Sequence, residues 1–136
     1  MRTELAADPR SVREARRAVR DALRAWDLEH LEASAVLLTS ELTTNAVLHA
    51  RSGLAVEVEH RGDTVRVSVL DASSVGPLVR NHGLQAGTGR GLGLVRTLST
   101  AWGCEPAAAP YAKAVWFDLP LDPALLPDPA EGALLV

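Results

Sequence analysis

Cysteine and lysine are almost absent from this chain, with one residue of each. The single cysteine, Cys104, excludes a disulfide within the chain and cannot by itself supply the thiolates of a metal cage. The single lysine, Lys113, lies downstream of the glycine-rich stretches, which excludes the phosphate-binding motif G-x-x-x-x-G-K-[ST]. So little thiol is typical of a protein from an intracellular, reducing compartment.

Long apolar runs and an excess of positive charge are missing too. No apolar run approaches the roughly 18 residues of a membrane span, and the opening residues, MRTELAADPR, lack the apolar centre of a signal peptide. We therefore expect a cytoplasmic protein without a membrane partner. The formal net charge of -3 argues against nucleic acid as a partner. The length of 136 residues, 47% of them hydrophobic, predicts a single globular core.

The spacing of apolar residues predicts two consecutive helices. The first should begin with Asp8 as N-cap and Pro9 in its first turn, and it carries an arginine-rich outer face. The second should span about residues 31–50 and end at the segment RSG. Its predicted core-facing stripe consists of Leu31, Ala35, Leu38, Leu42 and Ala46.

Beyond residue 53 the spacing of apolar residues changes from a helical period to an alternation of two. The segments LAVEVEH and TVRVSVLD alternate apolar and polar residues around the turn RGD, which predicts an antiparallel hairpin. LGLVRTLSTAWG has helical spacing up to Trp102 and should close at Gly103; CEPAAAPYAKAVWFDLP should form a last pair of strands. The expected fold is an α+β two-layer sandwich, with three main helices on one face of a mixed, mainly antiparallel sheet. Residues 1–119 should form the domain and residues 120–136 a proline-rich, irregular tail.

Three polar residues follow one side of the second predicted helix. Glu41, Asn45 and His49 are four residues apart, so they form a row beside the apolar stripe. A carboxylate at Glu41 can accept a proton, and the side-chain oxygen of Asn45 is a hard ligand suited to Mg²⁺. The alternative is that Glu41 and Asn45 are solvated helix residues and that His49 is a packing or capping residue.

Two further features can bind a nucleotide. The segment GTGRGLGL, with Gly87, Gly89, Gly91 and Gly93, leads into a helix, where backbone N–H groups and the helix dipole favour phosphate. Its spacing does not fit G-x-G-x-x-G, and a flexible linker is the alternative. Asp71, which ends a predicted strand, can accept a hydrogen bond from an exocyclic amine, or it can serve as a turn residue.

Taken in order, ELTTNAVLHA, DASSVGP and GTGRGLGLV resemble the motifs of the Bergerat-type (GHKL) ATP-binding domain. That fold is shared by gyrase, a class of chaperones, histidine kinases and mismatch-repair ATPases. Together with the final AVWFDLP, the chain is most similar to the small actinobacterial type of anti-sigma factor serine/threonine kinases. The resemblance spans about residues 12–119.

The resemblance implies a role for each matching position. Glu41 would be the catalytic base, Asn45 the Mg²⁺ ligand and Asp71 the adenine-binding aspartate. The remaining residues that the resemblance places near ATP are His49, Ser73, Gly76, Gly87, Thr88, Gly89, Arg90, Gly91, Leu92 and Gly93. The first glycine box departs from the wider pattern D-x-G-x-G, because Ser73 and Val75 replace its two glycines. A side chain at Ser73 can narrow the adenine pocket.

The resemblance also implies ATP and Mg²⁺ as cofactors, a sigma factor and a STAS-type anti-sigma antagonist protein as partners, and a possible homodimer. The expected activity is phosphorylation of the antagonist, combined with sequestration of the sigma factor. A domain that sequesters a partner without phosphoryl transfer is the main alternative. A split histidine kinase and a gyrase-like machine are weaker, because the phosphoacceptor pattern and a large transducing domain are missing from the sequence.

Overall fold

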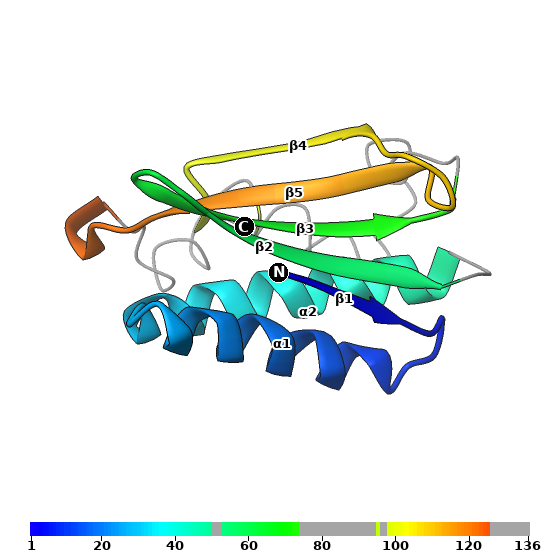
Figure 1. Cartoon of the computed structure of the whole chain (residues 1–136), viewed down its shortest axis with the longest axis horizontal. Coiled ribbons are helices and arrows are strands. Elements are labelled where there is room, and N and C mark those ends of the chain that lie inside the picture. The colour runs from blue at the N-terminus through cyan, green and yellow to red at the C-terminus, as the bar shows by residue number, and fades with distance from the viewer. Residues whose placement is uncertain (50–52, 74–94, 96–97, 126–136) are drawn as a thin grey trace.

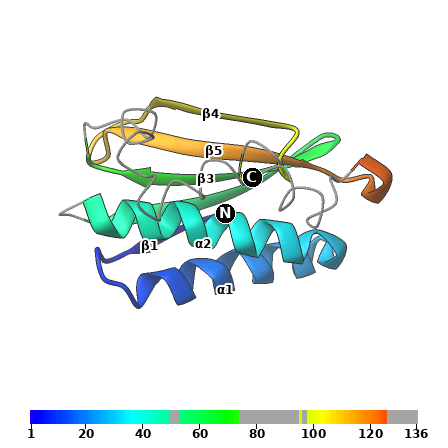
Figure 2. The same cartoon turned by 180° about the vertical axis from the view of Figure 1, so that it is seen from behind.

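The computed structural model describes residues 1–49, 53–73, 95 and 98–125, and these residues form two layers (Figure 1). One layer is a five-stranded sheet in the order β1-β2-β3-β5-β4, and all its pairings are antiparallel. The other layer holds two helices side by side on one face of that sheet (Figures 1 and 2). The predicted α+β sandwich is confirmed, with an antiparallel rather than a mixed sheet.

The helices and strands that were predicted occur in the predicted order along the chain. The helices are α1, Ser11–Ala25, and α2, Glu32–His49, joined by the 3-10 turn Glu29–Leu31. The strands are β1, Arg2–Leu5; β2, Leu54–Arg61; β3, Thr64–Asp71; β4, Ala101–Pro106; and β5, Lys113–Pro120. A short 3-10 turn, Pro123–Leu125, follows β5.

The core lies between the helices and the sheet. All five residues of the predicted stripe are at most 4% exposed, four of them in α2 and Leu31 in the 3-10 turn before it, so the helical period was interpreted correctly. They pack with the inward valines of β2 and β3 and with Phe117 and Leu119 of β5. Because inward and outward residues alternate along a strand, Ala55, Leu70 and Ala114 form a small second cluster.

The first helix begins later than predicted. The Asp8 carboxylate accepts a hydrogen bond from the backbone N–H of Arg10 (2.8 Å), and the Asp8 carbonyl accepts one from Ser11 N–H (2.8 Å). Asp8 therefore closes a turn before the helix instead of capping it. The residues of α1 that face the core are Ala15, Val19 and Leu23, each 0% exposed, and Ala22, which is 8% exposed.

The two ends of the sheet differ from the prediction. Residues 2–5, which were not predicted as a strand, pair with β2 as an edge strand, and Arg2 forms an ion pair of 2.6 Å with Glu57. The predicted third helix does not reach Trp102. Val95 and Leu98 are helical and buried, but Trp102 and Gly103 belong to β4, opposite Phe117 and Trp116. Sheet pairing here overrides a helical pattern of apolar residues.

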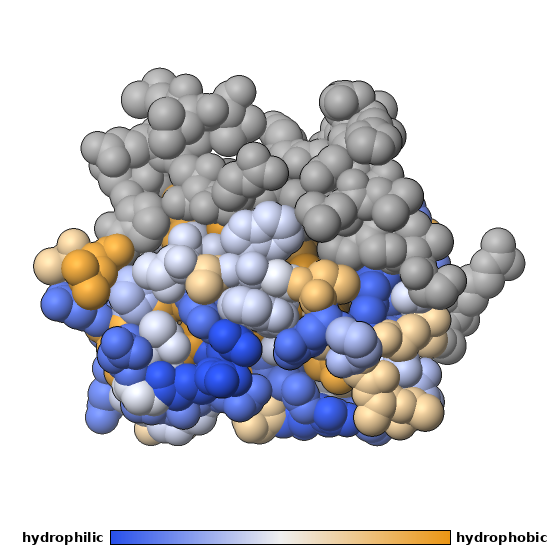
Figure 3. Space-filling model, turned by 90° about the horizontal axis from the view of Figure 1, so that it is seen from above, coloured by the Kyte–Doolittle hydropathy of each residue, from blue (hydrophilic) through white to orange (hydrophobic). Residues whose placement is uncertain are grey.

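The surface seen from the β4 side is mixed in character (Figure 3). Hydrophilic residues cover much of the coloured area, and hydrophobic atoms show between them. In the described part of the chain, no helix is both long and apolar enough to cross a membrane.

Candidate functional site

Asp71, the last residue of β3, is held through both its backbone and its side chain. Its carbonyl oxygen accepts a hydrogen bond from Ala112 N–H (2.7 Å), and its Oδ1 accepts one from Ser73 N–H (2.8 Å). The residue is 3% exposed. The turn role that the sequence left open for Asp71 is therefore present, but its carboxylate is also buried.

Lys113 lies opposite Asp71 in the sheet, as the first residue of β5. Its Nζ is 3.1 Å from Asp71 Oδ1 and donates to the Ser73 carbonyl oxygen at 3.3 Å. The two charged side chains are only 8% and 5% exposed. Burying an ion pair costs desolvation energy that good geometry and additional hydrogen bonds must offset. Ser73 contributes one such contact to each partner.

The sequence-based assignment of site residues missed Lys113. The available signal was a lysine at the start of an otherwise apolar strand, because lysines are rarely buried without a partner. The partner itself was not visible, since it depends on the register that sets residue 113 opposite residue 71.

Asn45 lies beside this ion pair. A small cavity of about 20 Å³ is lined by Leu42, Asn45 and Ala46 from α2 and by Val69, Asp71, Lys113 and Val115 from the sheet. It has room for about one water molecule. Two of the predicted site residues, Asn45 and Asp71, are therefore brought together from segments that are far apart in the sequence.

Glu41 and His49 lie on either side of Asn45 along α2. Glu41 is partly exposed, and His49, the last residue of the helix, is exposed. Neither lines the cavity. Within the predicted polar row, Asn45 is the member that reaches it.

The glycine-rich side of the predicted site lies outside the described residues. This applies to Gly76, Gly87, Thr88, Gly89, Arg90, Gly91, Leu92 and Gly93. Ser73 immediately precedes this part of the chain, and Val95 and Leu98 follow it in the core.

Comparison with protein families matches residues 5–107 to the histidine kinase-like ATPase domain. The chain belongs to the histidine kinase-like ATPase family. The matched span includes α2, β3 and the glycine-rich segment, but it ends before β5 and therefore before Lys113. Comparison with curated proteins gave no match.

Family membership indicates that the domain uses ATP. A cavity of about 20 Å³ is far smaller than the usual 300–1,000 Å³ of a small-molecule pocket. A purine base would not fit this cavity without movement of the side chains that line it.

Magnesium is compatible with the described donors. Among the residues with described positions, no three His, Cys, Asp or Glu side chains are grouped so that they could hold a metal. Mg²⁺ in nucleotide sites needs few protein ligands, because phosphates and waters supply the rest. The amide oxygen of Asn45 suits this role, whereas the Asp71 carboxylate is engaged by Lys113.

Proposed function

We propose that this histidine kinase-like ATPase is a Mg·ATP-dependent serine/threonine protein kinase of the anti-sigma factor type. It would phosphorylate a STAS-type antagonist protein and sequester a sigma factor. The supporting observation is that Asn45 and Asp71 share one cavity in a chain of this family. The kinase subtype and both partners come from the sequence resemblance.

In this proposal each described residue has a distinct task. Asp71 accepts a hydrogen bond from the exocyclic amine of adenine, and Asn45 holds the metal against the phosphates. Bound Mg²⁺ supplies positive charge that stabilises the phosphoryl group in transfer. Glu41 orients the attacking hydroxyl and accepts its proton, as the new oxygen–phosphorus bond forms and the bond to the leaving ADP oxygen breaks.

A second candidate function is partner binding without phosphoryl transfer. It is favoured by the contact between Lys113 and Asp71, since a ligand must compete with an ammonium group for the same carboxylate. The size of the cavity shared by Asn45 and Asp71, about 20 Å³, also favours it, because a base does not fit there without movement of the lining side chains.

Two measurements test the proposed function. Calorimetric titration should show heat of binding for ATP with Mg²⁺, and much weaker binding of GTP, because guanine has a carbonyl oxygen at C6, where adenine has the amine that would donate a hydrogen bond to Asp71. Incubation with γ-labelled ATP and a STAS-type antagonist should transfer label to the antagonist. ATP binding without transfer would favour the second candidate, and no binding of either nucleotide would contradict the proposal.

A further inference from the structure

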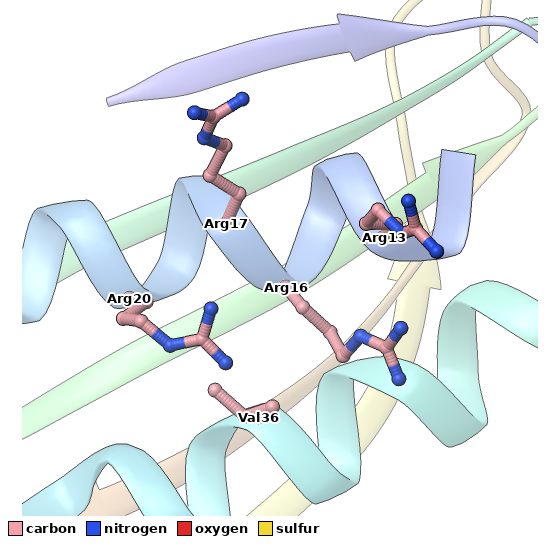
Figure 4. Close-up of a pocket in the computed structure, with 5 residues that line it drawn as sticks. All are labelled: Arg13, Arg16, Arg17, Arg20 and Val36. Atoms are coloured by element: carbon pink, nitrogen blue, oxygen red, sulfur yellow. The ribbon is translucent and has the colours of Figure 1, made fainter. Parts of the chain in front are cut away.

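An arginine row on α1 faces a groove that is separate from the nucleotide cavity. Arg13, Arg16, Arg17 and Arg20, together with Val36 of α2, line a cavity of about 350 Å³. Arg16 and Arg20 extend toward α2 near Val36, whereas Arg17 points away from α2 (Figure 4). Val36 and Asn45 are nine positions apart on α2, about 13 Å along the helix axis.

Few carboxylates balance this row. In the part of the chain that the structure describes, Arg13, Arg16 and Arg17 form no ion pair. Arg20 is 3.9 Å from Glu32, but Glu32 is closer to Arg24, at 2.8 Å. The row is therefore a local positive patch on a chain whose net charge is -3.

Within α1, every charged residue three or four positions from Arg16 or Arg20 is an arginine, which is unfavourable for the isolated helix, whereas Arg17 has Glu14 and Asp21 at these spacings. Like charges three or four residues apart destabilise a helix by about 0.2–0.5 kcal/mol per pair. Arg13 also lies in the first turn of α1, where the helix dipole disfavours a cation. A bound anion would remove both penalties, which gives the groove a physical reason to attract one.

We propose that this α1–α2 groove docks an acidic protein segment. The segment would carry two carboxylates about one helical turn apart, to pair with Arg16 and Arg20, and an apolar side chain between them to cover Val36. Val36 is only partly buried, so the groove combines the arginine side chains with one accessible apolar side chain.

This mixture favours a protein segment over other polyanions. A nucleic acid would present phosphates without an apolar group to cover Val36, and the acidic remainder of the chain would repel an extended polyanion. A membrane surface requires an apolar helix face for insertion. The apolar face of α1 is not available to a membrane, because Ala15, Val19 and Leu23 are fully buried in the core.

Designed helical peptides test the proposal with the full chain. One fluorescein-labelled, alanine-based peptide carries two Glu four residues apart with Leu between them, and a second has Gln in place of each Glu. Fluorescence anisotropy at low salt should show binding of the acidic peptide, weakening as salt screens the charges. The double variant Arg16→Gln/Arg20→Gln should bind the acidic peptide about tenfold more weakly, because it loses the charge pairs between these arginines and the two glutamates of the peptide.

Arg61→Gln is the control, since Arg61 is exposed at the end of β2 and does not line the groove. It should bind the acidic peptide within about twofold of the unmodified chain.

Thermal unfolding should show that the double variant is at least as stable as the unmodified chain. If the double variant is less stable, the single variant Arg13→Gln is tested in its place, and it too should bind the peptide more weakly. Equal binding by the groove variant and the control, or equal binding of the Gln peptide, would overturn the proposal. So would tighter binding of single-stranded DNA or phosphatidylserine vesicles through the same arginines.

Discussion

The Lys113–Asp71 pair shows how strongly one buried contact can constrain a site. Replacing Lys113 by Met leaves the Asp71 carboxylate buried without its cation. Removing one partner of a buried ion pair costs about 3–5 kcal/mol, so Lys113→Met should lower the free energy of unfolding by about that amount in urea denaturation. Adding Asp71→Asn should recover much of the loss. The control Arg61→Met removes an exposed pair at 3.8 Å and should cost about 0–1 kcal/mol; equal losses in the two single variants would contradict a coupled buried pair.

Asn45 and Glu41 should have separable effects in the proposed kinase. Asn45→Ala removes the amide oxygen that we assign to Mg²⁺, so Mg-dependent ATP binding should be abolished in calorimetry. Glu41 does not line the cavity, so Glu41→Ala should retain ATP binding but stop label transfer to the antagonist. Intact transfer in both variants would refute both role assignments.

Helix α2 contains two hydroxyls that lack hydrogen bonds. Thr39 and Thr43 are 0% exposed, and within the described structure their Oγ1 atoms have no hydrogen-bond partner. Because an unsatisfied buried polar group costs about 1–3 kcal/mol, Thr39→Val should raise the free energy of unfolding by about 1 kcal/mol. Thr44→Val, on the partly exposed side of α2, should change it by less than about 0.5 kcal/mol. Destabilisation by Thr39→Val would indicate that the hydroxyl is satisfied in solution.

Strand β4 depends on the small size of Gly103. A Cβ at this position would lie 2.9 Å from Cζ2 of Trp116. The indole cannot shift easily, because the Arg66 guanidinium lies 3.7 Å from the centre of its ring and is held by two hydrogen bonds to Asp118. Gly103→Ala should therefore lower the unfolding free energy by about 1–3 kcal/mol. Glu105→Ala, at an exposed position of the same strand, is the control and should have little effect; equal unfolding midpoints would show that the sheet accommodates the methyl group.

Both layers of the fold contribute to the proposed nucleotide site, so ligand binding should stabilise the folded chain. At a concentration 100 times its dissociation constant, Mg·ATP should add about 2.7 kcal/mol to the free energy of unfolding. Thermal unfolding with ATP, with and without a chelator, measures this effect. Equal stabilisation with and without Mg²⁺ would rule out the metal role of Asn45, and stabilisation by GTP equal to that by ATP would rule out base selection by Asp71.

Local periodicity was sufficient to predict α2 and the β2–β3 hairpin. Each depends on a repeat, 3.6 residues in the helix and two in the strands, that follows from backbone geometry alone. The predicted polar row on α2 placed Asn45 correctly beside the core, because a residue's face on a helix is a local property. The same reasoning identified Asp71 at the end of a strand.

Tertiary contacts decided the features that local patterns could not. Residues 2–5 became a strand only because β2 offered an unpaired edge, and Trp102 left its helical pattern because β5 pairs with it. The contact of Lys113 with Asp71, and the meeting of Asp71 with Asn45 at one cavity, depend on strand register and on how the helix layer packs on the sheet. Residue spacing along the chain carries no information about such non-local pairings, which is why the sequence could single out Asn45 and Asp71 separately, while the fold was needed to reveal Lys113 beside them.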